Sequence, residues 1–449
     1  MNRPVALVLV ALVSCLVLTT GDAQVKRQQP PVNPFTGQAI QPSAGYNPLT
    51  GKGQPPAAAA GWPRGEPPVT GKAGAGLTAL DKAVRKIMDH HGIPGAALAV
   101  AYKGKLVYAK GHGWADLATA TPVEPDTLFG LASCSKPLTA LATLLLVERG
   151  KLSLDDRAFD HLKHIKAPRG ARVDARLKTV TVRHLLNHTA GWDRGVRGDP
   201  VTWSPMISRA LRVPQPVTNE QFISYMMSVR LDFNPGAKHV YSNVGYMLLE
   251  AIIEKVSGEN YETFVRDNVL KPAGVDRPFI SANRTGYGKG EAHCHLAGST
   301  VQLPPYNLPM ARAAAGWVAS AVDLVRLLTA LDGSRGKRLL ADKTFKEMVA
   351  APPPPVKKGK TGTYPGLGWP LAGPSGNGYG YAHDGHWPGT RTFMKCNHAK
   401  GLNWALLFNV SMQPDTADLS AVKDAARELE ELLDGTDRFP DLDLFDTFR

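Results

Sequence analysis

The chain has 449 residues, of which 43% are hydrophobic and 20% are charged. This balance is that of an ordinary globular protein, so it excludes collagen, a coiled coil and a wholly disordered chain. Beyond residue 20 no apolar run approaches the length of about 18 residues that spans a bilayer. A multi-span membrane protein is therefore excluded as well.

The net charge of +13 is spread along the chain. Residues 24–76 hold five basic residues and one acidic residue, and the remaining basic residues are scattered rather than interleaved with aromatic residues. This pattern predicts a solvated surface and no nucleic-acid partner. A polyanion-binding envelope protein that uses residues 24–76 is left as an alternative.

Residues 1–23 have the pattern of an export signal. A basic residue is followed by the uncharged run Pro4–Thr20, and the small residue Ala23 precedes the expected cleavage point. We therefore expect a periplasmic or extracellular protein with no stable membrane span after cleavage. A permanent anchor is an alternative, as is lipid attachment at Cys15, although the apolar core continues beyond that cysteine.

Residues 24–76 are crowded with Pro, Gly, Ala and Gln, and the pattern of Asn33–Gly37 recurs at Asn47–Gly51. Such a segment buries too little apolar surface to offset its ordering entropy, so it is predicted to be a disordered spacer. The folded catalytic domain is expected over residues 77–434, followed by a C-terminal tail over residues 435–449.

Within the folded region, hydrophobic periodicity and turn residues predict a series of helices and strands. In chain order they are a helix at 77–91, a strand hairpin at 95–102 and 105–110, an apolar helix at 137–150, a helical segment at 181–187, an amphipathic helix over 244–256, two strands at 390–396 and 403–410, and a closing helix at 415–433. The order predicts an α/β (α+β) fold, with a sheet built from both ends of the domain, flanking helices and an inserted, mostly helical lobe.

Cysteine and histidine form no convincing metal-binding pattern. The cysteines that would survive export are too few for a disulfide framework. They are Cys134, Cys294 and Cys396. The pair His184 and His188 lacks the Glu of a zinc-protease helix, and His293 and His295 have no second pair at a finger-like spacing. We therefore expect structural histidines, no metal and no other cofactor.

Ser133 and Lys136 form the first candidate catalytic element. At three-residue spacing on a helix start, both side chains face the same side, so the amine can reach the hydroxyl. A serine hydroxyl is a poor nucleophile until a base takes its proton, and a desolvated lysine can do so. The alternative is a helix-capping serine beside a solvated lysine.

Tyr241 and Asn243 form the second element, immediately before the amphipathic helix. In an extended segment the two side chains point to one face. They would supply a phenol that relays a proton and an amide that holds a lysine or a substrate carbonyl.

The third element begins at His383 and leads into the pair of C-terminal strands. Gly385 carries no side chain that would block the approach of a substrate to the backbone. The N–H of the next residue, His386, can then join that of Ser133 as an oxyanion hole.

The three elements, in this order, resemble the serine β-lactamase and penicillin-binding-protein superfamily, in its class C-related branch of DD-peptidases and esterases. Six further segments carry the same resemblance, which extends from about residue 77 to 433. They are Phe129–Ala140, Gly150–Asp156, Thr181–Trp192, Phe233–Gly258, Ala315–Leu331 and Gly366–Trp369. The resemblance implies a β-lactamase/transpeptidase-like fold with an antiparallel sheet.

The resemblance also implies roles for the candidate residues. Ser133 would be the acylated nucleophile, Lys136 its activating base and Tyr241 the proton relay to the leaving group. Asn243 would position groups in the site and His383 would line the cleft. Substrate binding would further involve Gly385 and the N–H groups of Ser133 and His386.

A second triplet, Lys360–Gly362, spells the Lys-Thr-Gly form of the third motif. It lies in a loop rich in Pro, Gly and Lys rather than at the start of a strand, and it precedes Gly366–Trp369. We therefore assign the third element to His383–Gly385.

Together these features predict an exported serine hydrolase that forms an acyl-enzyme with a small ester, peptide or β-lactam, with cell-wall peptidoglycan as a further candidate partner. Esterase and D-amino-acid peptidase or carboxypeptidase activities are favoured, because a neutral His383 lacks the fixed charge of a lysine facing a β-lactam carboxylate. The alternatives are a class C-like β-lactamase and a catalytically silent penicillin-binding or sensor module.

Overall fold

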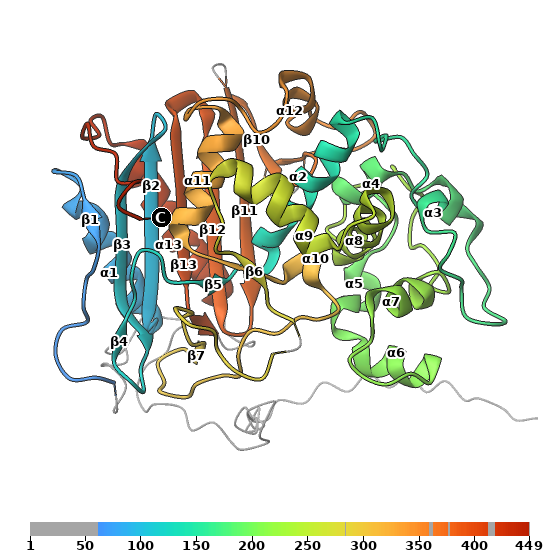
Figure 1. Cartoon of the computed structure of the whole chain (residues 1–449), viewed down its shortest axis with the longest axis horizontal. Coiled ribbons are helices and arrows are strands. Elements are labelled where there is room, and N and C mark those ends of the chain that lie inside the picture. Colours follow the sequence, from blue (N-terminus) through green and yellow to red (C-terminus); the bar gives the residue numbers. More distant parts are fainter. Residues whose placement is uncertain (1–61, 283, 359–361, 376–377, 412–417, 449) are drawn as a thin grey trace, which may run out of the picture. The chain divides into compact units, whose positions relative to one another are not determined.

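The structure is a computed structural model, and it describes residues 62–282, 284–358, 362–375, 378–411 and 418–448 (Figure 1). Its centre is a nine-stranded sheet with the strand order β1-β3-β2-β13-β12-β11-β10-β9, and β4 pairs with β3. The strands are β1 (Lys72–Ala73), β2 (Gly95–Tyr102), β3 (Lys105–Asp116), β4 (Thr121–Pro122), β9 (Tyr364–Pro365), β10 (Pro370–Ser375), β11 (Gly378–Trp387), β12 (Thr390–Asn397) and β13 (Leu402–Phe408).

Every pairing in this sheet is antiparallel, and β2 lies directly beside β13. Leu98 in β2 pairs with Leu406 in β13, which pairs in turn with Phe393 in β12. Segments from the two ends of the domain therefore meet in the middle of the sheet, as the sequence predicted.

Helices cover both faces of the sheet, because successive strand residues point to opposite sides. One face packs against α1 (Thr78–His91) and α13 (Asp418–Asp434) through a cluster that includes Leu98, Phe393 and Leu406. The other face packs against α11 (Ala321–Asp332), with Ala99 and Ala405 in a core that also includes residues of α2 (Ser135–Glu148).

The lobe between the two halves of the sheet is mostly helical, as expected. Its helices are α3 (Ala158–His161), α4 (Val182–Leu186), α5 (Arg194–Arg197), α6 (Ser204–Leu211), α7 (Asn219–Met226), α8 (Asn243–Ser257), α9 (Tyr261–Val265) and α10 (Arg312–Ala315), and α12 (Asp342–Met348) follows α11. The short turns are η1 (Ala132–Cys134), η2 (Ala175–Thr179), η3 (Pro200–Thr202), η4 (Arg266–Leu270), η5 (Lys271–Ala273) and η6 (His398–Lys400). Two small sheets join β5 (Phe129–Gly130), β8 (Trp317–Ala319) and β6 (Phe279–Ile280), and β7 (His295–Leu296) with β14 (Val410–Ser411).

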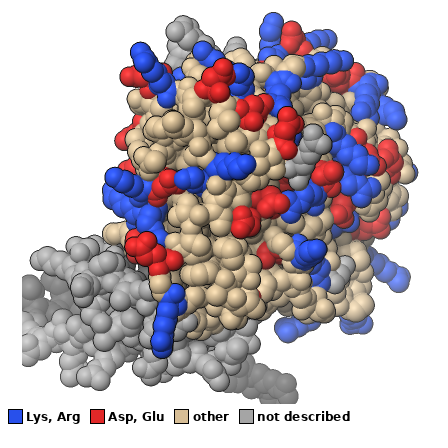
Figure 2. Space-filling model, turned by 60° about the vertical axis from the view of Figure 1, so that its left-hand side comes forward, with Lys and Arg blue, Asp and Glu red and all other residues tan. Residues whose placement is uncertain are grey.

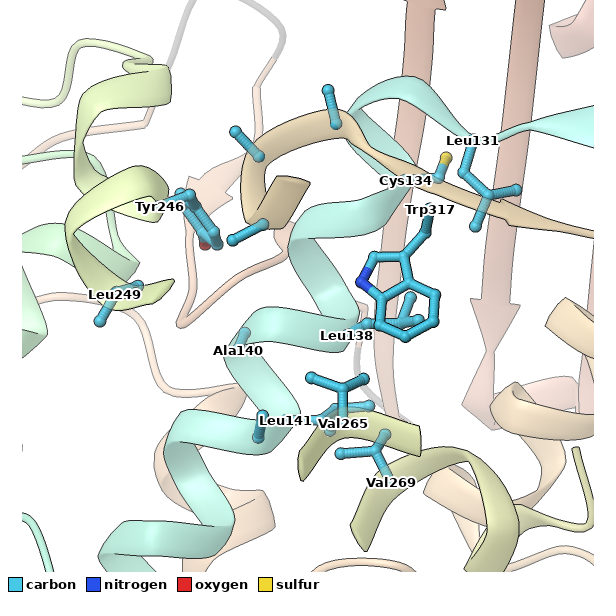
Figure 3. Close-up of a cluster of buried hydrophobic side chains, with 14 of the residues drawn as sticks. Leu131, Cys134, Leu138, Ala140, Leu141, Tyr246, Leu249, Val265, Val269 and Trp317 are labelled. Carbon is cyan, nitrogen blue, oxygen red and sulfur yellow. The ribbon is translucent and has the colours of Figure 1, made fainter. Parts of the chain in front are cut away.

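Helix α2 passes through the core, and its residues 135–146 are all buried. A helix that is apolar on every side needs neighbours on every side, and α8, α9 and α10 supply them. Figure 3 shows this packing: Leu138 and Leu141 of α2 lie among Trp317, Val265 and Val269. The start of α2, where the first candidate element lies, is therefore held rigidly.

The predicted periodic elements are confirmed, with small changes at their ends. The hairpin is β2 and β3, and β3 continues to Asp116. The predicted strands at 390–396 and 403–410 are β12 and β13, followed by the separate pair Val410–Ser411. The short strands β9 and β10 and most of β11 were not predicted, because their Gly and polar residues give no clear alternation.

The sheet includes residues that precede the predicted start of the folded domain at residue 77. Lys72 and Ala73 form β1 and pair with β3, and the Thr70 N–H donates to the Gly111 carbonyl at 2.9 Å. An exposed edge strand offers unpaired backbone groups, and this segment satisfies those of β3. The end of the predicted spacer is thus part of the sheet.

The predicted C-terminal tail also packs on the domain. Phe445 is fully buried, and Arg326 and Arg335 lie 4.6 and 4.4 Å from its ring centroid. The Leu444 N–H donates to the Leu106 carbonyl at 2.8 Å. An aromatic ring and a backbone bond to β3 therefore fix this segment.

The predicted signal peptide, the Cys15 alternative and the spacer repeat lie outside the described residues. Among the helices that the structure describes, none combines the length and the apolar character needed to cross a membrane. On the face drawn in Figure 2, basic and acidic side chains are interspersed rather than gathered into a patch of one sign.

Candidate active site

Ser133 lies in η1, between β5 and α2. The turn is fixed on both sides: the Leu131 N–H donates to the Trp317 carbonyl at 2.8 Å, and the Thr392 hydroxyl donates to the Leu131 carbonyl at 2.8 Å. Ala132 has a φ of +46°, a left-handed conformation that is costly for a residue with a Cβ. This bend leaves Ser133 partly exposed, while its chain neighbours are buried.

Lys136 is fully buried one helical turn from Ser133. Its Nζ donates to Ser133 Oγ at 3.1 Å and to the Ala314 carbonyl at 2.8 Å. Burial lowers the pKa of this amine to about 7, because a desolvated ammonium is unfavourable. A substantial fraction of Lys136 is therefore neutral at neutral pH and able to accept a proton.

Tyr241 lies beside this pair on the segment that leads into α8. Lys136 Nζ is 4.9 Å from the centroid of its ring. Burial raises the pKa of Tyr241, and a side-chain hydrogen bond with Ser133 acts in the opposite direction. The phenol thus keeps its proton in the resting site and touches the same hydroxyl as Lys136.

Asn243 begins α8 and takes part in a contact that was not predicted. Its Nδ2 donates to Asp199 Oδ2 at 2.7 Å. Asp199 also lies 3.7 Å from Arg194, whose guanidinium is 4.9 Å from the Tyr241 ring centroid. Asn243 therefore anchors a charged pair at the edge of the site.

The third element, which begins at His383, lies on β11, and β11 pairs with β12. The Cys134 thiol donates to the His383 carbonyl at 3.4 Å, which ties the strand to the turn that carries Ser133. A Cβ on Gly385 would stand 2.3 Å from the Leu131 carbonyl oxygen and 3.1 Å from the Ser133 nitrogen. Glycine is needed here because β11 and the Ser133 turn meet backbone to backbone.

His383 is buried, and burial lowers the pKa of its imidazole to about 4. Its Nδ1 lies 2.8 Å from the Asp384 carbonyl, and its ring centroid is 6.4 Å from that of Tyr241. The imidazole is thus neutral at neutral pH. His386, two residues beyond Asp384, pairs with Arg391 across the strands.

These side chains border one open cleft of about 820 Å³. Ser133 borders this cleft together with residues of the helical lobe and, opposite them, residues of β11, β12 and α13. The lobe contributes His188, Arg194, His239 and Tyr241, and the opposite wall includes His383, Asp384, His386, Arg391, Lys395, Lys423, Arg427 and Glu430. The structure therefore brings all seven predicted site residues to one region: six lie around the cleft and the Ser133 turn, and Asn243 lies at its edge through Asp199.

Sequence reasoning missed Arg194, Asp199, Asp384 and the carbonyl of Ala314. Each is far from Ser133 in sequence: Arg194 and Ala314 lie in the short helices α5 and α10, Asp199 in a loop and Asp384 in β11, so no spacing rule connects them. His188 was considered only as a partner of His184, yet its ring centroid lies 4.4 Å from that of Tyr241. Only Asp384 could have been found from the sequence, because it is a charged residue within the third element, next to His383.

The histidine pairs are separate in the structure. His184 takes part in a capping box at the start of α4, in which the Thr181 N–H donates to its Nδ1 at 3.2 Å. His188 instead accepts a bond from the Ser242 N–H at 3.2 Å. His293 lies 3.2 Å from Asp116 and stacks on Tyr287.

One group in the described part of the chain brings together three side chains of the types that bind metals: Asp332, Cys396 and His398. Asp332 already accepts a hydrogen bond from Asn403 at 2.7 Å, and burial raises the pKa of the Cys396 thiol. The alternative third motif, Lys360–Gly362, lies mostly outside the described residues.

The sequence of this chain is similar to those of known proteins. A family model described as Beta-lactamase matches residues 80–427. A penicillin-binding protein of Bacillus subtilis (strain 168) is 28% identical over 364 residues, which are 76% of this chain and 73% of the relative.

Two solved structures share the fold. The octameric penicillin-binding protein homologue from Pyrococcus abyssi has a TM-score of 0.63 and 27% identity, covering 80% of this chain and 78% of its own. A crystal structure of SurE with D-Leu has a TM-score of 0.61 and 27% identity, covering 81% and 76% of the two chains.

Proposed function

Because the chain belongs to the β-lactamase family, we propose that it is a serine hydrolase that works through a covalent acyl-enzyme. This proposal rests on the contact between Lys136 Nζ and Ser133 Oγ at 3.1 Å, in which the lysine side chain is fully buried. A lysine with a pKa of about 7 is a base suited to neutral pH.

The geometry supports a sequence of proton transfers in which charges balance. Neutral Lys136 accepts the proton of Ser133 as Oγ forms a bond to the substrate carbonyl carbon. The N–H groups of Ser133 and His386 stabilise the oxyanion. The bond to the leaving group then breaks as the proton taken up by Lys136 is relayed through Tyr241 to the departing nitrogen or oxygen, so both residues return to their neutral state. Water later attacks the acyl carbon and gives a proton to Lys136, and this proton passes to Ser133 Oγ as the acyl bond breaks.

The proposed substrates are esters and peptides that contain D-amino acids. The similarity to a penicillin-binding protein and to a SurE structure that holds D-Leu supports this class. A β-lactam is less well matched. His383 is neutral, and the nearby cation Arg391 lies 3.5 Å from Asp384, so its charge is partly compensated.

We further propose that the enzyme acts outside the cytoplasm, in the periplasm or extracellular space. The apolar run Pro4–Thr20 and the small residue Ala23 support this location. An N-terminal sequence of the protein purified from its native host, compared with that of a cytoplasmic control, tests cleavage after Ala23.

A rate panel tests the proposed activity. It compares a D-Ala-D-Ala peptide, a short-chain p-nitrophenyl ester and a chromogenic cephalosporin at equal enzyme concentration. We expect kcat/KM to be higher for the ester or the peptide than for the cephalosporin. A cephalosporin turned over faster than both would indicate a class C-like β-lactamase, and turnover of none would indicate a silent binding module.

A further inference from the structure

Asp384 lies in the wall of the cleft and has no role in the reaction described above. It follows His383 on β11 and precedes Gly385, whose backbone meets the Ser133 turn. It borders the same cleft as Ser133, and 37% of its side chain is exposed. An accessible carboxylate therefore stands on the sheet side of the nucleophile.

Two cations hold this carboxylate. Arg391 from β12 and Lys423 from α13 each place a side-chain nitrogen 3.5 Å from an Asp384 oxygen. Burial acts to raise the pKa of Asp384, but Lys423, His383 and Arg391 outweigh it, so the pKa lies below its usual value. The carboxylate is therefore ionised at neutral pH.

The two cations would otherwise form a site for an anion carried by the substrate. Arg391 is almost fully buried within the wall, and Lys423 is half exposed at its rim. With Asp384 between them, their combined charge falls from two to one. A second carboxylate that enters this place also faces direct repulsion from Asp384, because like charges a few ångströms apart disfavour each other.

We propose that Asp384 is a specificity-determining residue that excludes substrates with a carboxylate on the sheet side of the scissile bond. The enzyme then prefers peptide amides and esters to peptides that end in a free carboxylate. This inference rests on the proposed acyl-enzyme function and narrows it from a carboxypeptidase toward an amidase or esterase.

A matched pair of peptides tests the inference. An acylated D-Ala-D-Ala peptide and its C-terminal amide share the same scissile bond and differ in one charge. For the wild-type enzyme we expect a higher kcat/KM for the amide. In Asp384→Asn the ratio of the carboxylate to the amide kcat/KM should rise at least about tenfold, which corresponds to about 1.4 kcal/mol.

A second variant moves the ratio in the opposite direction. Lys423→Met removes one cation and leaves Asp384 less compensated, so the ratio should fall severalfold. Glu430→Gln is the control, because Glu430 also borders the cleft as a carboxylate but is paired with Lys395. Its ratio should stay within about twofold of the wild type.

The outcomes separate this inference from the proposed function. A ratio that stays at the wild-type value in both Asp384→Asn and Lys423→Met would overturn the role of Asp384 while leaving the hydrolase intact. If Asp384→Asn does not fold, the Lys423→Met ratio decides alone. Absence of turnover for both peptides, together with no acylation of Ser133, would instead refute the proposed function.

Discussion

Lys136 differs from an ordinary lysine because its side chain is fully buried. The Nζ atom lies 4.9 and 5.6 Å from the ring centroids of Tyr241 and Tyr246, and its hydrogen bonds go to Ser133 and Ala314. Burial is the main cause of its lowered pKa. Two charged residues have the next largest effects on this pKa: Asp199 acts to raise it and Arg194 acts to lower it.

These charges give a prediction about pH. The base must be neutral, so kcat/KM should rise as the pH increases through about 7. In Arg194→Met the pKa of Lys136 rises, because a positive neighbour is lost and Asp199 is left uncompensated. The ascending limb of the pH profile should then move to higher pH by about half a unit.

Arg197→Met is the matched control. Arg197 lies in the same short helix α5, but its guanidinium pairs with Asp232 at 2.8 Å. Its pH profile should coincide with that of the wild type. An unchanged limb in Arg194→Met would contradict the assignment of that limb to Lys136.

For single residues, the sequence predicted a contact within one helical turn and missed contacts between segments that are far apart in the chain. Ser133 and Lys136 were predictable because helical spacing places them together. The bond from Asn243 to Asp199 was not, since the two residues belong to α8 and the loop before η3 and meet through tertiary packing.

Strands and helices with regular hydrophobic spacing were predictable as elements, and irregular ones were not. The strands β2 and β13 are fully or almost fully buried and read as continuous apolar runs. By contrast, β1 is two residues long and depends on the edge of β3 rather than on its own composition. Its local sequence resembles the spacer that precedes it.

The segment after α13 gives a prediction about stability. Phe445 is fully buried between two arginine side chains, whereas Phe448 is half buried. Phe445→Ala should lower the free energy of unfolding by about 3 kcal/mol through loss of apolar contacts and a cavity. Urea unfolding measures this change. Phe448→Ala should cost clearly less, and equal values would mean that the segment does not pack as described.

For the whole molecule, buried neutral histidines make the free energy of unfolding depend on pH. Burial lowers the pKa of His112 and His295, as well as His383, to about 4 in the folded chain. Their unfolded values are near 6.5. A depressed folded pKa contributes stability above the unfolded value, and this contribution is lost as the pH falls through the folded value. Stability should therefore decline between about pH 6.5 and 4.

His112 isolates this effect, because it lies in β3 beside Asp81 of α1 and does not border the cleft. Its Nε2 is 3.0 Å from the Tyr108 hydroxyl, which donates to Asp81 at 2.7 Å. In His112→Gln the loss of unfolding free energy between pH 7 and 5 should be smaller than in the wild type by about 2 kcal/mol. Urea unfolding at both values gives this difference directly, and an identical loss in the two proteins would disprove the linkage.

The architecture of the whole molecule was accessible from the sequence because it follows from where the apolar strands lie. Strands at both ends of the domain with a helical stretch between them can bury their apolar surface by forming one sheet. The limits of the domain were less accessible. They depend on Lys72–Ala73 and Phe445, whose neighbours in sequence are polar or rich in Gly and Pro.

The central claim is that Ser133 becomes acylated. Intact-mass and peptide mass spectrometry after treatment with an acylating serine inhibitor tests it most directly. We expect one acyl group on the peptide that contains Ser133, no label in Ser133→Ala, and retained label in Ser135→Ala, whose side chain accepts a bond from the Trp317 N–H instead. Equal labelling of folded Ser133→Ala, or a label on another residue, would contradict the account.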